Sequence, residues 1–199
     1  MSALAPCVRR GECGSRVAVG TDCLLALLDE HSAGATFLCR SWVAGRHPES
    51  IRRILDAGHE TASHGTDHRR LTELTSDEFR ESVRASKIVL EDLAGKEVIG
   101  YRAPSFSIVP GREWALDIEV EEGYRCDSSL FRVRRGGYGY PGASRVPHAR
   151  EKRSRAILEL PPATVRRFGM TLPAAGGGYL RLVPLGLVRD ALRQAEIAA

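Results

Sequence analysis

The sequence lacks several features that define large classes of proteins. It contains no run of eighteen or more apolar residues, so no membrane-spanning helix is expected. The opening stretch MSALAPCVRRGECGSR has no continuous apolar segment of the kind a secretory signal needs, which predicts a cytoplasmic location. The three glycines at 176–178 are not followed by Gly-Lys-Ser or Gly-Lys-Thr, so no phosphate-binding P-loop is indicated.

The sequence has few cysteines, and their spacing fits neither a disulfide framework nor a metal-binding motif. The five cysteines are Cys7, Cys13, Cys23, Cys39 and Cys126. Their number is odd and none of them forms a CxxC pair. This pattern predicts a reduced compartment, with neither a disulfide framework nor a thiolate zinc site.

The remaining composition indicates one globular domain. A chain of 199 residues with 43% hydrophobic content can bury a sizeable core. The net charge of +4 comes partly from two basic clusters, RVRRGG at 132–137 and HAREKRSRA at 148–156. Both clusters lie in glycine- and proline-punctuated sequence without interleaved aromatic residues or a known reader motif. They therefore predict charged loops, and no nucleic-acid partner is expected.

Short apolar runs alternate with helical patterns between residues 35 and 131. The expected strands are 35–39, 59–65, 98–107 and 124–131, and the expected helices are 20–34, 48–58, 75–95 and 111–123. Thr75 and Glu78 form a capping-box pattern at one helix start, and Gly95 is suited to end that helix. Repeated β-α-β units predict a parallel sheet with helices outside it, and ligand-binding loops at the carboxyl ends of the strands.

The texture of the sequence changes after residue 131. A loop rich in glycine, proline and arginine is expected up to residue 155, followed by one strand within 156–165. A glycine-rich connection at 172–184 then leads to a final helix at 185–199.

Two histidines follow the expected second strand, in the stretch ETASHGTDHRRL at 60–71. His64 and His68 are four residues apart, so both imidazoles could reach one cation if the backbone between them turns helically. Gly65 stands where the metalloprotease motif H-E-x-x-H has its glutamate, so that motif is excluded. The spacing alone also fits solvated or helix-capping histidines.

Two further polar residues are expected on the same rim of the sheet. Arg102 follows the third strand and precedes Ala103 and Pro104; it could hold a carboxylate or form a surface ion pair. Asp127 lies within a strand pattern, where aspartate is uncommon, and a buried aspartate needs a partner. Arg102 is one candidate partner, and a turn formed with the following serines is the alternative.

Three segments together resemble polysaccharide deacetylases of the NodB-homology type, carbohydrate esterase family four. They are ATFLCRSWVAGRHPESIRRILDAGHETASHGTDHRRL, GYRAPSFSI with WALDIEVEEGYRCDSSLF, and LELPPATVRRFGMTLPAAGGGYLRLVP. The nearest similarity is to the branch linked to bacterial exopolysaccharide biosynthesis. The resemblance covers nearly the whole chain and implies a single deacetylase domain at 1–199, with a core at 17–135 and a branch-specific part at 136–199.

The resemblance implies an α/β fold, an irregular (β/α) barrel of the glycoside hydrolase/deacetylase type. It implies a divalent metal, usually zinc, with His64 and His68 as two of its three protein ligands. Arg102 would orient the general base and Asp127 would support Arg102, while Pro104 and Ser105 would contact the substrate. The implied reaction is hydrolysis of an acetamide on an N-acetylated polysaccharide, in which the metal polarises the carbonyl and activates water.

The sequence departs from the family pattern at both ends. The paired aspartates that supply the third ligand and the base are not found, and Asp22, the first aspartate, stands alone in a helical pattern. A C-terminal motif that would supply the acid histidine is also not found, and His148 lies in a different context. We therefore expect a barrel without its first strand, truncation at both ends with a start codon assigned too late, and little activity from this polypeptide.

Two alternatives to a sugar deacetylase remain open at this point. One is a catalytically inactive remnant that only binds sugar or a partner protein. The other is an amidohydrolase that acts on a non-sugar amide. The missing aspartates and acid histidine favour the remnant. The residues of the substrate-facing loops would decide between a sugar amide and a non-sugar amide.

Overall fold

A six-stranded mixed sheet forms the centre of the molecule. The computed structural model describes residues 16–152 and 155–198. The strand order is β1-β2-β3-β4-β6-β5, and all neighbours are parallel except β5 and β6. In this order the strands are Thr36–Cys39, Glu60–Ser63, Gly100–Tyr101, Cys126–Asp127, Arg155–Glu159 and His148–Lys152. Within the described residues the sheet is open, with β1 at one edge and β5 at the other.

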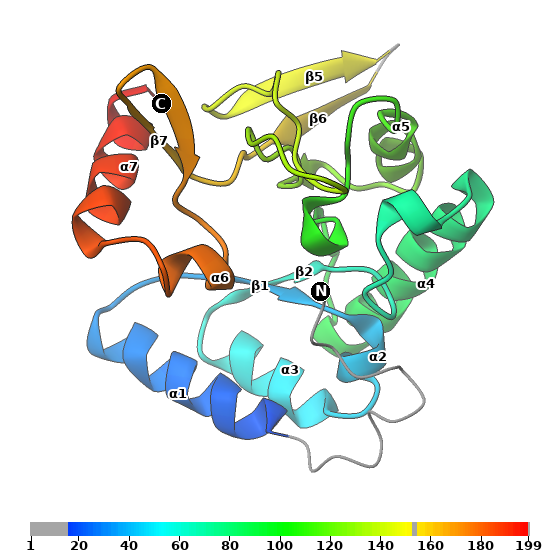
Figure 1. Cartoon of the computed structure of the whole chain (residues 1–199). Coiled ribbons are helices and arrows are strands. Elements are labelled where there is room, and N and C mark those ends of the chain that lie inside the picture. The colour runs from blue at the N-terminus through cyan, green and yellow to red at the C-terminus, as the bar shows by residue number, and fades with distance from the viewer. Residues whose placement is uncertain (1–15, 153–154, 199) are drawn as a thin grey trace.

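Helices connect the parallel strands and cover one side of the sheet, while the C-terminal elements lie on another side (Figure 1). The helices are α1 Val17–Glu30, α2 Ser41–Ala44, α3 Pro48–Asp56, α4 Ser76–Ala94, α5 Trp114–Glu121, α6 Gly177–Leu180 and α7 Leu185–Ala198. Two 3-10 turns, Leu71–Glu73 and Pro104–Phe106, follow β2 and β3. The β-α-β order confirms the expected α/β fold with an incomplete, barrel-like sheet.

Helix α4 begins and ends where the sequence predicts. The Thr75 hydroxyl accepts a hydrogen bond from the Glu78 N–H at 3.2 Å, and the Glu78 carboxylate accepts one from the Thr75 N–H at 2.8 Å. Without these two side-chain acceptors, both backbone N–H groups at the start of the helix would be unpaired. Gly95 ends the helix in the left-handed conformation, with φ at +62°.

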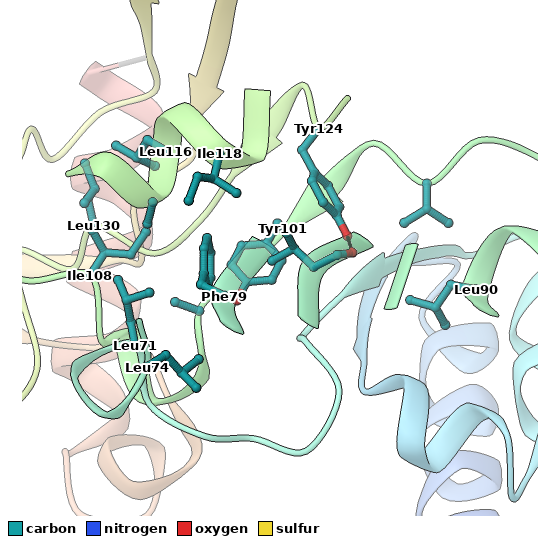
Figure 2. Packing of buried hydrophobic residues seen from close by; sticks show 14 of the residues in the cluster. Leu71, Leu74, Phe79, Leu90, Tyr101, Ile108, Leu116, Ile118, Tyr124 and Leu130 are labelled. Carbon is teal, nitrogen blue, oxygen red and sulfur yellow. Dashed lines mark hydrogen bonds between the residues drawn. The ribbon is translucent and has the colours of Figure 1, made fainter. Parts of the chain in front are cut away.

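The main core lies between the sheet, α4 and α5. Figure 2 shows Tyr101 of β3 packed among aromatic rings, and its ring centroid lies 5.8 Å from that of Phe79 and 5.6 Å from that of Tyr124. The Tyr124 hydroxyl donates to the Val83 carbonyl at 2.8 Å, so this buried polar atom is paired. This core fixes the positions of the strand ends that carry the candidate site.

The C-terminal part differs from the sequence-based prediction. Residues 148–152, expected to be loop, form strand β5 as one arm of a hairpin with β6. A second hairpin joins β7, Thr164–Arg167, to β8, Met170–Pro173, where a strand and a glycine-rich connection were expected. Neither hairpin could be predicted from a composition rich in arginine and glycine, because cross-strand pairing rather than local propensity stabilises them.

Candidate functional site

His64 and His68 lie in the loop that follows β2, and their rings are close. The ring centroids are 5.0 Å apart in an edge-to-face arrangement. The chain reaches this geometry without a helix, because Gly65 and His68 both have positive φ, +68° and +70°. The two rings therefore approach each other through a left-handed loop rather than through a helical turn.

The protonation of His64 is fixed by a neighbouring strand end. Its Nδ1 lies 2.6 Å from the carbonyl oxygen of Arg102. A carbonyl oxygen only accepts, so Nδ1 carries the proton and donates, which leaves Nε2 with the lone pair of the neutral ring. Burial, together with the charges nearby, lowers the pKa of His64 to about 4 despite this hydrogen bond. A neutral imidazole oriented by a backbone carbonyl is the usual form of a metal-binding histidine.

The described residues do not complete a metal site. Within 16–152 and 155–198, no group of three or more His, Cys, Asp or Glu side chains is arranged to hold a metal ion. Catalytic zinc sites use three protein ligands. The two imidazoles could supply two of them, and the described residues do not supply the third. Asp22, the first aspartate, lies in α1 and pairs with Arg53 of α3 at 2.6 Å.

Arg102 lies directly after β3 and connects three strand ends. Its N–H donates to the Ser63 carbonyl at 3.0 Å, at the end of β2. Its guanidinium donates from Nε to the Ser128 carbonyl at 3.0 Å and from a terminal nitrogen to the Ser128 hydroxyl at 2.6 Å. Arg102 is therefore positioned through both its backbone and its side chain, which leaves its carbonyl aimed at His64.

Asp127 is fully buried at the end of β4, and its hydrogen bonds go to the serine two residues on. One carboxylate oxygen accepts from the Ser129 N–H at 2.9 Å and the other from the Ser129 hydroxyl at 2.5 Å. The guanidinium of Arg102 bonds to Ser128 instead, so the expected direct pairing is replaced by the turn that the sequence left as the alternative. Asp127 still acts on Arg102, because its charge opposes the lowering of the Arg102 pKa by burial.

A cavity of about 450 Å³ lies against the side chains of this strand-end network. Arg102, Asp127 and Ser128 line it, together with residues of β1 and β2 and the segment that follows β6. His68 and Pro104 instead line a separate, much smaller cavity. Ser105 has positive φ, +56°, in the 3-10 turn between Arg102 and the buried Ser107. The substrate contacts expected from Pro104 and Ser105 stay predictions.

Sequence analysis missed two carboxyl groups beside this network. Glu119 of α5 and Glu159 of β6 are both fully buried, and burial first and the nearby Asp127 second raise the pKa of both. The signal for Glu159 is alternation in β6, where Ile157 and Glu159 are buried while Leu158 is exposed. A glutamate on the buried face of a strand is unusual enough to have drawn attention.

The fold and the strand-end polar network define a class: an α/β protein with an open, barrel-like sheet and its candidate site at the carboxyl ends of the strands. Comparisons with known proteins narrow this class. Residues 15–111 match the polysaccharide deacetylase family, and residues 128–198 match a domain of unknown function, DUF3473. These two matches are similarities over separate parts of the chain.

Two curated relatives carry deacetylase names. Peptidoglycan deacetylase of Helicobacter pylori is 29% identical over 115 residues, which covers 57% of this chain and 38% of the relative. Peptidoglycan-N-acetylglucosamine deacetylase of Bacillus cereus is 25% identical over 138 residues, which covers 63% of this chain and 50% of the relative. The matched region thus spans half or less of the length of each of these relatives.

Solved structures agree with the fold. A Mycobacterium smegmatis structure assigned as a polysaccharide deacetylase has a TM-score of 0.61 at 33% identity, covering 72% of this chain and 45% of that one. A Pseudomonas aeruginosa structure assigned to the same class has a TM-score of 0.57 at 22% identity, covering 71% of this chain and 43% of that one. The second likeness bears on the fold alone.

No helix in the part of the chain that the structure describes has the length and apolar character needed to cross a membrane.

Proposed function

We propose that this chain carries part of the active site of a metal-dependent polysaccharide N-deacetylase, a hydrolase that releases acetate from an N-acetylated glycan. The observation that supports this most is the hydrogen bond from His64 Nδ1 to the Arg102 carbonyl. It joins two of the segments that carry the family resemblance, and it presents a neutral imidazole beside a second one. The deacetylase names of the relatives support the same reaction class.

In this proposal each residue at the strand ends has one role. His64 and His68 bind a divalent ion, and zinc suits two imidazoles. Arg102 lies at the cavity and orients the base, Asp127 maintains the charge opposite Arg102, and the turn at Pro104 and Ser105 contacts the sugar. The 450 Å³ cavity, which Arg102 lines and the two histidines do not, is of a size that accepts a sugar unit.

We further propose that residues outside the described ranges complete this site. The described donors stop at two imidazoles, and the family pattern implies a carboxylate ligand, a base and an acid histidine in addition. A segment that precedes Met1 in the genomic reading frame is the proposed source of the aspartates. The resemblance of 158–184 to the exopolysaccharide-linked branch is the basis for proposing that kind of polysaccharide as substrate.

A second candidate function is binding of a glycan without turnover. The incomplete ligand set favours it for the polypeptide as printed, because two histidines alone hold zinc weakly.

Acetate release from an N-acetylated oligosaccharide tests both candidates. We expect the printed chain, with added zinc or cobalt, to release no more acetate than its His64→Ala variant. We expect the chain extended by its upstream in-frame segment to release acetate, and His64→Ala to abolish that release. Turnover by the printed chain that His64→Ala abolishes would disprove the incomplete-site proposal. An inactive extended chain would contradict the deacetylase proposal.

A further inference from the structure

The segment that follows β6 lines two cavities. One is the 450 Å³ cavity beside Arg102, and the other has a volume of about 340 Å³. Arg145, in the loop before β5, Thr164 of β7 and Gln194 of α7 also line the second cavity. The residues common to both linings are Leu160, Pro161 and Ala163. A polymer bound in the first cavity therefore has the second cavity directly beside it.

The described partners of Arg145 in the second cavity are all neutral. Its Nε donates to the Thr164 hydroxyl at 3.0 Å. Its Nη2 donates to the Thr164 carbonyl at 2.8 Å and to the Gln194 side-chain oxygen at 2.7 Å. Within 16–152 and 155–198, no carboxylate pairs with Arg145, and its Nη1 makes no hydrogen bond. The guanidinium is thus fixed in place, with one nitrogen and its positive charge left for a ligand.

Two more arginines lie near Arg145. The Nη1 of Arg132 donates to the carbonyl of Ala143, two residues before Arg145, at 3.1 Å. The N–H of Arg166 donates at 2.9 Å to the same Gln194 oxygen that accepts from Arg145. Burial first, and then the charges of Arg132 and Arg166, lower the pKa of Arg145. Arginine nevertheless stays charged in proteins, so like charges are crowded here around a partly buried cation.

The rest of the lining indicates what kind of anion fits. Val146, Pro147 and Ala195 add apolar surface to the residues shared with the first cavity. Apolar walls with a single fixed charge suit a sugar ring that carries a carboxylate, and about 340 Å³ is within the range of small-ligand sites. Glu196 is the one acid that the described lining contains, and it is exposed, so water screens its charge.

The composition of the surrounding segment has the same sign. Residues 128–198 carry more net positive charge than the whole chain, whose net charge is +4, because arginine and lysine there far outnumber aspartate and glutamate. A basic part of this kind attracts polyanions from a distance. The fixed guanidinium of Arg145 would then select the carboxylate at short range.

We propose that the cavity around Arg145 binds the carboxylate of an acidic sugar unit, in a glycan chain that extends into the cavity beside Arg102. The proposal deepens the proposed function, because it names an acidic polysaccharide as the substrate class. Binding at Arg145 requires no metal and no turnover.

Calorimetric titration of the full chain with oligogalacturonate, and with its neutral methyl ester, tests the site. We expect the acid form to bind and the ester to bind at least about tenfold more weakly, because a charged hydrogen bond is lost. Arg145→Gln should weaken binding of the acid form by a similar factor. Equal binding of acid and ester, or binding of neither, would overturn the proposal.

Arg134→Gln is the matched control for net charge. Arg134 is exposed and is not among the residues that line the cavity, so its loss removes the same charge from the same basic segment. We expect it to leave the affinity for oligogalacturonate unchanged. An equal loss of affinity in Arg134→Gln and Arg145→Gln would show general electrostatic attraction and contradict a site at Arg145.

Gln194→Glu separates binding from folding. The new carboxylate would stand where the Gln194 oxygen now accepts from Arg145, and would give Arg145 the acidic partner that the described residues lack. We expect the free energy of unfolding in urea to be maintained and oligogalacturonate binding to be lost. A folded Gln194→Glu variant that binds like the wild type would contradict the proposal.

A competing polyanion and the acetate-release assay complete the test. A single-stranded DNA oligonucleotide of equal charge should not displace oligogalacturonate; displacement that depends on Arg145 would assign the cavity to nucleic acid and overturn the proposal. Failure of acetate release would contradict the deacetylase proposal and leave the binding result unchanged. Intact acetate release without any binding of the acid form would overturn the Arg145 proposal alone.

Discussion

The Nδ1 atom of His64 lies 2.6 Å from the carbonyl oxygen of Arg102. The ends of β2 and β3 are therefore joined by a hydrogen bond in which His64 is the donor. Two sequence segments separated by 38 positions thereby form one local structure. The guanidinium of Arg102 extends the connection to Ser128 after β4. The candidate site is thus a property of three neighbouring strand ends rather than of the histidine spacing.

Replacement of Arg102 by lysine should destabilise the fold. Lysine is a single flexible donor and cannot reproduce the two-pronged contact with Ser128, so one or more partly buried acceptors are left unpaired. We expect the free energy of unfolding in urea to fall by about 1–3 kcal/mol. The exposed Arg52 provides the matched control as Arg52→Lys. Equal effects of the two substitutions would contradict this role for Arg102.

Loss of the capping box at α4 should have a smaller, well-defined cost. In Thr75→Ala the N–H of Glu78 loses its acceptor, and Glu78 is no longer held by the Thr75 side chain. We expect a loss of about 1 kcal/mol in urea unfolding. Ser76→Ala, one position into the helix, is the control and should change stability little. A neutral Thr75→Ala would show that the box contributes no stability here.

The turn between β7 and β8 predicts a stabilising substitution. Phe168 and Gly169 both have positive φ, +50° and +74°, as a type I′ turn requires, and Phe168 is 87% exposed. Asparagine adopts this conformation more readily than phenylalanine, and little buried area is lost. We expect Phe168→Asn to raise the unfolding temperature, by an amount that corresponds to roughly 0.5–1 kcal/mol. A lower unfolding temperature would show that the ring of Phe168 contributes packing.

The buried glutamates predict a decrease in stability with rising pH. The pKa of Glu159 is about 10 in the fold and about 4.3 in an unfolded chain. Between these values the folded state keeps the proton and the unfolded state releases it, so the stabilising contribution is complete below the lower pKa and is lost as pH rises. Each pH unit lowers the free energy of unfolding by about 1 kcal/mol.

Comparison with Glu159→Gln isolates this contribution. The amide has no proton to release, so its unfolding free energy should depend less steeply on pH than that of the wild type across pH 5–9. Urea titrations at several pH values measure both slopes, and Glu121→Gln controls for a change in net charge. Identical slopes for wild type and Glu159→Gln would refute the assignment of a bound proton to Glu159.

The sequence predicts the elements whose signals are local and misses those set by tertiary contacts. The capping box at Thr75 and the left-handed Gly95 are properties of a few adjacent residues, so α4 is predicted to within one residue at each end. Strands β5, β7 and β8 depend on partners across a hairpin, and the turn Phe168–Gly169 carries an uncommon residue at its first position. Their formation cannot be inferred from composition.

The same distinction holds at the candidate site. The positions of His64, Arg102 and Asp127 at strand ends are predictable, because each lies in an expected strand and at or directly after an observed one. Glu119 lies in a helix pattern next to the exposed Glu121, so its burial follows only from the packing of α5 against α4 and β6. The Arg102 guanidinium bonds to Ser128 rather than to Asp127, and this choice of partner depends on geometry that sequence spacing does not reveal.

Calorimetric titration of the full, metal-stripped chain with zinc tests the central claim most directly. We expect one weak site whose affinity falls at least tenfold in both His64→Ala and His68→Ala. The matched control is His148→Ala, because the Nδ1 of His148 also lies 3.0 Å from a backbone carbonyl, that of Val146, and His148 belongs to the edge strand β5. Its affinity should equal that of the wild type. Zinc binding that survives the loss of His64 and His68, or that depends on His148, would contradict the account.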